Sequence, residues 1–149
     1  MVRHSRRVLA AILLAPLLWL QGCDEPPGPG GVAFHDAWVR PVPPRQSMTA
    51  AYGRIENRDA RARTIMSWTS DTFDRVSVHQ TDVRNGVSSM RELAAIGLLP
   101  LESMPLEPGG MHLMLMGARR ELRVGDSIKL TATDDSGTQW EFTVPVEAR

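Results

Sequence analysis

The chain of 149 residues is poor in cysteine, in aromatic side chains and in long apolar runs. These shortages exclude certain kinds of bond and structure. With a single cysteine, the chain can form no intrachain disulfide. Its apolar run at residues 8–20 is 13 residues long, shorter than the roughly 17 to 25 that a membrane-spanning helix needs. The chain has no Gly-x-Ser-x-Gly motif and no histidine-rich metal triad, so hydrolytic machinery has little to be built from and we expect no enzyme.

The start of the chain has the layout of a bacterial export signal. A basic head at residues 3–7 precedes the apolar run, which ends in the sequence LQGC at residues 20–23. This ending resembles a lipobox, in which a small residue precedes a cysteine that receives a diacylglycerol on its thiol. We therefore predict a lipoprotein signal peptide at residues 1–22 and a lipid anchor on Cys23. The alternative is an ordinary secretory signal with an incidental cysteine.

The residues after Cys23 predict where the protein is held. Residues 23–31 contain the Pro- and Gly-rich stretch EPPGPGG, which reads as a tether to a domain at residues 32–149. Asp24 resembles the residue that keeps lipoproteins of enteric bacteria in the inner membrane, which favours an anchor on the periplasmic face of that membrane. Loss of residues 1–22 removes three of 17 basic residues and no acidic ones, leaving a net charge of −3. This charge argues against a nucleic-acid partner.

From residue 32 onward, short β-like runs alternate with Pro, Gly, Asn and Asp clusters, and no segment shows a convincing 3.6-residue apolar period. The sequence therefore predicts an all-β domain, a Greek-key β-sandwich of about seven to eight strands. The strands are expected at residues 32–39, 49–55, 64–68, 75–81, 87–93, 111–116, 127–133 and 138–144. The side chains expected to anchor the core are Trp38, Trp68, Phe73, Trp140 and Phe142.

One predicted hairpin allows a register to be worked out. Asn85-Gly86 favours a type I′ turn, because both positions tolerate positive φ angles. A two-residue loop at this point pairs Thr81 with Met90. His79 lies on the same face as Thr81, so His79 and Met90 become diagonal neighbours within reach of one ion. A three-residue loop would move them to opposite faces.

A second pair of the same chemistry occurs in the segment GGMHLMLMG at residues 109–117. In a strand, alternate side chains share a face, so His112 and Met114 point to the same side. Each pair joins an imidazole to a thioether. Thioether sulfur binds Zn²⁺, Mg²⁺ and Ca²⁺ poorly but suits Cu(I). A blue-copper centre is excluded because it needs a cysteine thiolate and Cys23 is the predicted lipid attachment point.

Together, His79, Met90, His112 and Met114 have the spacing H-x10-M-x21-H-x-M, which resembles that of the periplasmic copper chaperones of the PCuAC type. The segments HDAWVRPVPP, TAAYGRIEN, NGVSSMREL and PLEPGGMHLMLMG also resemble that family, as does the chain over about residues 32–147. The resemblance implies a cupredoxin-like fold, a single Cu(I) held by these four residues, and delivery to the CuA centre of cytochrome c oxidase subunit II. Delivery would be direct or through a Sco-type thiol protein, and we expect a monomer.

Several questions stay open at this stage. The same ligands would serve a periplasmic copper storage or resistance protein, and a structural lipoprotein with a chance pattern is a further alternative. Met116 lies on the face of His112, where packing is favoured over a role as a ligand, whereas Met111 is expected to point away. We expect Met48, Met66 and Met104 in the core or in loops. His35 is expected to be exposed.

Overall fold

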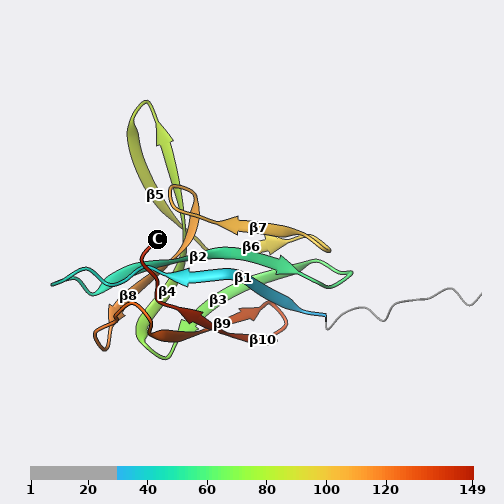
Figure 1. Cartoon of the computed structure of the whole chain (residues 1–149). Coiled ribbons are helices and arrows are strands. Elements are labelled where there is room, and N and C mark those ends of the chain that lie inside the picture. The colour runs from blue at the N-terminus through green and yellow to red at the C-terminus, as the bar shows by residue number, and fades with distance from the viewer. Residues whose placement is uncertain (1–29) are drawn as a thin grey trace, which may run out of the picture.

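The computed structural model describes residues 30–149, which fold into strands without a helix (Figure 1). The predicted signal peptide, Cys23 and most of the predicted tether lie outside the described residues. Within residues 30–149, no helix is long and apolar enough to span a bilayer. The strands are β1 (Val32–Val39), β2 (Met48–Asn57), β3 (Arg63–Ser70), β4 (Phe73–Arg84), β5 (Val87–Leu93), β6 (Ile96–Leu98), β7 (Ser103–Leu106), β8 (Met111–Ala118), β9 (Ser127–Asp134) and β10 (Gln139–Pro145).

The strands form a sheet that curls around one core. Its order is β1-β2-β8-β4-β3-β9-β10, with β5 beside β4, β6 beside β3 and β7 beside β2. The two ends of the sheet meet where Val39 bridges Val146 in parallel, and Glu147 donates its backbone N–H to the Val39 carbonyl at 2.9 Å. The eight predicted strands all form, and β6 and β7 are two additional short ones. The prediction of an all-β, cupredoxin-like sandwich is thus confirmed.

Alternation along the strands separates a core face from an outward face. On β8, Leu113 and Leu115 are fully buried, whereas His112, Met114 and Met116 take the other face. Two of the predicted aromatic anchors, Trp68 and Phe73, lie in the core, and Trp140 and Phe142 pack against it. Trp38 is also buried, and its ring packs at a tilt against that of Tyr52, with ring centroids 4.8 Å apart.

A buried ion pair fixes the end of β9. Asp134 has no exposed side-chain surface, and Arg63 Nη1 donates to its Oδ2 at 2.7 Å. Hydrogen bonds from Ser136, from the backbone N–H of Thr138 and from Arg63 outweigh the effect of burial and lower the pKa of Asp134 to about 2. The carboxylate therefore remains charged in the folded protein down to acidic pH.

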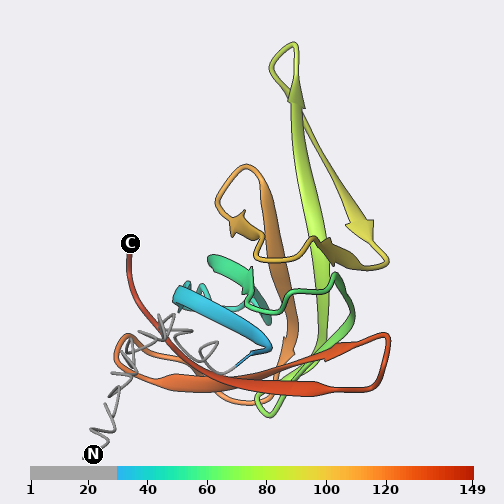
Figure 2. The same cartoon turned by 90° about the vertical axis from the view of Figure 1, so that its right-hand side faces the viewer.

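The β4–β5 hairpin projects from the body of the sheet, as Figures 1 and 2 show. Asn85 and Gly86 have φ angles of 52° and 78°, as a type I′ turn requires. Arg84 pairs with Val87 and Thr81 pairs with Met90, so the predicted two-residue loop and its register are confirmed.

Candidate metal centre

Two histidines face each other on neighbouring strands. His79 on β4 pairs directly with His112 on β8, and their ring centroids lie 6.0 Å apart. Metal–nitrogen bonds are about 2 Å long, so two imidazoles sharing one ion hold their ligating nitrogens at most about 4 Å apart. Ring centroids 6.0 Å apart allow such a separation when one nitrogen of each ring is turned toward the other ring. The sequence pattern predicted each histidine next to a methionine, but it did not predict this direct pairing.

The two methionines of the pattern lie on either side of the histidine pair. Met114 is two residues beyond His112 on the same face of β8, and it pairs with Ser77 of β4. Met90 comes from β5, where it pairs with Thr81 and is 51% exposed. The register thus brings all four predicted side chains to one face of three adjacent strands, β8, β4 and β5.

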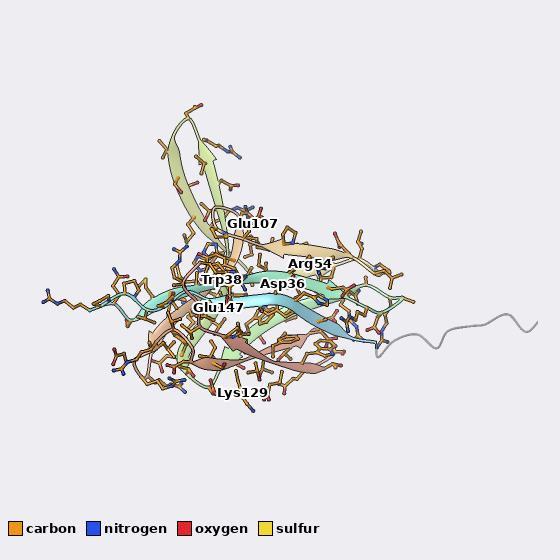
Figure 3. The ribbon with its side chains drawn as sticks, viewed as in Figure 1. Asp36, Trp38, Arg54, Glu107, Lys129 and Glu147 are labelled. Carbon is orange, nitrogen blue, oxygen red and sulfur yellow. The ribbon has the colours of Figure 1, made fainter. Side chains whose placement is uncertain are left out.

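A cavity of about 440 Å³ opens at this face. Met90, His112 and Met114 line it, whereas His79 lies beside His112 outside the lining. The loop that joins β7 to β8 forms part of its wall, and Gly110 in this loop accepts a hydrogen bond from the Thr81 backbone N–H at 3.1 Å. Figure 3 labels Glu107 in the same loop, near the base of the projecting hairpin. The cavity therefore connects the two methionines with solvent and borders the buried His112.

The imidazole of His79 has one nitrogen engaged and one without a partner. Its Nε2 lies 2.9 Å from the Ser77 hydroxyl oxygen and 3.8 Å from Glu92. Its Nδ1 is buried and has no hydrogen-bond partner among the described residues. A buried polar atom without a partner is unfavourable, and a metal ion would satisfy it. His79 therefore fits a metal ligand that is oriented through its other nitrogen.

The ring of His112 is held in a similar way. Only 4% of His112 is exposed, and its Nδ1 lies 3.2 Å from the Gly110 carbonyl oxygen. When Nδ1 carries the proton and donates to that carbonyl, Nε2 keeps a free lone pair for a ligand. Both rings thus have the second hydrogen-bonding partner that usually fixes the tautomer of a metal-binding histidine.

The surroundings of His79 favour its neutral ring. Burial lowers the pKa of His79 below its ordinary value. Glu92 acts in the opposite direction, while His112 and Arg75 lower that pKa further. A neutral imidazole is the form that binds metals. At neutral pH, His79 is therefore ready to act as a ligand.

The donor set matches a soft, singly charged cation. Two imidazoles and two thioethers carry no charge, and thioethers prefer Cu(I) over Zn²⁺, Mg²⁺ or Ca²⁺. Across residues 30–149, no group of three or more His, Cys, Asp or Glu side chains lies close enough together to hold a metal ion. The candidate metal ligands in this part of the chain are therefore two imidazoles together with two thioethers.

The positions of the remaining methionines and of His35 confirm some of the sequence predictions and correct others. Met111 and Met104 pack against the core, as expected. Met48 and Met66 are instead strand residues that are 49% and 50% exposed, so their assignment to core or loop was wrong. The expectation that His35 is exposed was also wrong, because its side chain is 28% exposed and its Nε2 pairs with Glu56.

Three neighbours of the site were not predicted from the sequence. Glu92 pairs with His79 across the hairpin, and the same Asn85-Gly86 register that placed Met90 would have identified it. Tyr52 stands beside His112, with ring centroids 6.1 Å apart, and Ser77 contacts His79. No sequence signal marks Tyr52, because its strand and β8 are far apart in the chain.

Comparison with known proteins places the chain in a family. The family model described as "Putative lipoprotein LpqE-like" matches residues 32–146. The "Putative lipoprotein Lxx21020" of Leifsonia xyli subsp. xyli is 31% identical over 157 aligned positions, which cover 99% of this chain and 93% of that protein. The matched region contains all of the strands described above.

Solved structures agree with the sandwich. The copper-bound PCuAC domain from PmoF2 has a TM-score of 0.67 at 21% identity, covering 80% of this chain and 96% of the domain. The Cu(I) form of DR1885 from Deinococcus radiodurans has a TM-score of 0.61 at 23% identity, covering 86% of this chain and 85% of that one. At these identities the similarity establishes the fold. The chain therefore belongs to the LpqE-like family, and its domain has the fold of the PCuAC domains.

Proposed function

We propose that this protein is a periplasmic metallochaperone that binds one Cu(I) through His79, Met90, His112 and Met114. The observation that carries the proposal is the unpartnered, buried Nδ1 of His79, whose ring centroid lies 6.0 Å from that of His112. The strand registers place Met90 and Met114 on the same face as these two histidines. The PCuAC domains that share this fold include a copper-bound form and a Cu(I) form, which supports the choice of metal.

The site suits a carrier better than a permanent store. Its four neutral ligands leave the ion with a single positive charge, and no thiolate holds it. Met90 is half exposed on a projecting hairpin, so an acceptor can approach the ion from solvent. The acceptor we propose is the CuA centre of cytochrome c oxidase subunit II, reached directly or through a Sco-type thiol protein. Delivery involves ligand exchange and no catalytic turnover.

The predicted lipid anchor would hold the carrier near this membrane enzyme. The lipoprotein descriptions of the family and of the Leifsonia relative support lipidation of Cys23. Cys23→Ser should release the protein from the membrane fraction and leave Cu(I) affinity unchanged, because Cys23 precedes the domain. A variant that remains in the membrane fraction would contradict lipidation.

Copper transfer tests the proposed delivery. Mature protein carrying one equivalent of Cu(I) is mixed with a purified apo subunit II fragment, and the CuA absorption is followed after controlled oxidation. We expect the absorption to rise, and His112→Ala protein treated in the same way to give none. Failure of the loaded wild-type protein to metallate the fragment, together with normal oxidase activity but copper sensitivity in a deletion strain, would favour storage.

A further inference from the structure

The outward face of the sheet carries a second group of sulfur atoms next to the proposed site. On β2 and β8, Met48 pairs directly with Met116, and Ala50 pairs with Met114. Directly paired residues have Cβ atoms about 4.5 to 5.5 Å apart, close enough for two thioethers to bind one ion between them. Met114 lies between this pair and His112 along β8. The methionine side chains thus follow one another along the sheet from the histidine pair to Met116 and Met48.

Core packing does not explain this arrangement. Met48 is 49% exposed, and Leu113 and Leu115 already fill the core side of β8. Met48 also lines the same cavity as Met114 and His112. Ala50, which pairs with Met114, lines the cavity as well, and its small side chain takes up little of that space. A half-exposed methionine beside such space is available to an ion.

The two arginines beside this group of residues both have partners of their own. Arg75 of β4 pairs with Met116 on its other side, but its Nη2 donates to both carboxylate oxygens of Glu92, at 2.6 and 2.7 Å. Arg40, which also lines the cavity, lies over the ring of Tyr52 at 5.5 Å. The positive charge of Arg75 is therefore balanced by a carboxylate, and the guanidinium of Arg40 is held against an aromatic ring.

We propose that Met48 and Met116 form a second, two-coordinate Cu(I) position, through which the ion enters or leaves the four-ligand site. This inference rests on the proposed function. The bonds from copper to the two imidazole nitrogens and to the sulfur of Met90 break first, and bonds to the sulfurs of Met116 and Met48 form while Met114 still holds the ion. The bond to Met114 breaks last and leaves the ion with two sulfur ligands. Copper remains Cu(I), and neither a proton nor an electron moves. All of these ligands are neutral, and the ion keeps at least two of them throughout, so it never has to be released as a hydrated cation.

Titration with Ag(I), a redox-stable ion that shares the preference of Cu(I) for thioethers, tests the second position. The mature protein is labelled with ¹³C at its methionine methyl groups and followed by NMR. We expect the first equivalent to shift the methyl signals of Met90 and Met114, and the second to shift those of Met48 and Met116. Met66, equally exposed on β3, is the internal control and should not move.

Two other outcomes are informative in different ways. If Met90 and Met114 shift but Met48 and Met116 stay fixed through two equivalents, the second position is overturned and the proposed function stands. If none of the four signals shifts, the proposed function fails together with the inference that rests on it.

A pair of matched variants gives an independent test. Met48→Leu keeps the apolar side chain and removes the sulfur, so it should lose the second Ag(I) equivalent and retain the first. Met66→Leu should retain both equivalents. A Met48→Leu protein that still binds two equivalents, or that binds none, would overturn the arrangement.

Discussion

Replacement of Met90 by leucine separates copper binding from folding. Met90 is 51% exposed on β5, a strand whose residues are exposed apart from the half-buried Leu93. Substitutions at such surface positions change the free energy of unfolding by about 0.5 kcal/mol or less. Loss of a metal ligand should weaken binding at least as much as loss of a residue that orients one, about 10- to 100-fold. That factor corresponds to about 1.4 to 2.7 kcal/mol of binding free energy.

The affinity is measured by anaerobic competition for Cu(I) with a chromophoric chelator, and the fold by urea denaturation of the same samples. Met66→Leu is the matched control, because Met66 is 50% exposed on β3 and lies outside the cavity. We expect Met90→Leu to lower the Cu(I) affinity at least tenfold while the urea midpoint stays that of wild type. Equal affinities for the two variants would refute the assignment of Met90 as a ligand.

Three further perturbations test other parts of the structure. Ser77→Ala removes the hydroxyl 2.9 Å from His79 Nε2 and should weaken Cu(I) binding about tenfold in the same competition assay; unchanged affinity would mean that the contact does not orient the ring. Gly53→Ala would place a methyl group 2.7 Å from the Phe34 ring at a φ of 151°, and should destabilise the domain by about 1 to 3 kcal/mol in urea denaturation; an unchanged midpoint would contradict this strain. The folded-state pKa of Asp134, about 2, lies below the ordinary aspartate value of 3.8, so the contribution of its carboxylate to stability is complete above pH 3.8 and is lost as the pH falls through about 2. As the pH is lowered across that range, the urea midpoint should fall less steeply in Asp134→Asn than in wild type. Equal slopes for the two proteins would show that Asp134 does not cause this pH dependence.

Local sequence signals predicted the part of the site that one turn controls. Asn85-Gly86 determines the hairpin register, and the register brings Met90 to the face of His79. The alternation in residues 111–116 likewise assigned His112 and Met114 to one side, with Leu113 and Leu115 in the core. Both inferences depend on neighbours a few residues apart, where backbone geometry leaves few alternatives.

The pairing of β4 with β8 could not be derived in the same way. His79 and His112 are joined by a chain segment that forms β5, β6 and β7, and no single turn sets their register. The family resemblance implied that the histidines meet, whereas periodicity did not. β6 and β7 are only three and four residues long and β7 contains Pro105, so neither shows the alternation by which a strand is predicted.

The exposure of Met48 illustrates a related limit. An apolar side chain at the start of a strand is most simply predicted to be buried, because burial of apolar surface drives folding. The pairing with Met116 instead places it on the outward face, at the edge of the cavity. Only the strand order, which comes from contacts between distant segments, distinguishes these two positions.

X-ray absorption at the copper K edge of the protein carrying one equivalent of Cu(I) tests the central claim most directly. The edge reports the oxidation state, and the fine structure reports the number and kind of ligand atoms. We predict Cu(I) bound by two nitrogen and two sulfur atoms, with one sulfur lost in Met90→Leu. A copper ion surrounded only by nitrogen and oxygen, or an unchanged sulfur signal in that variant, would contradict the account.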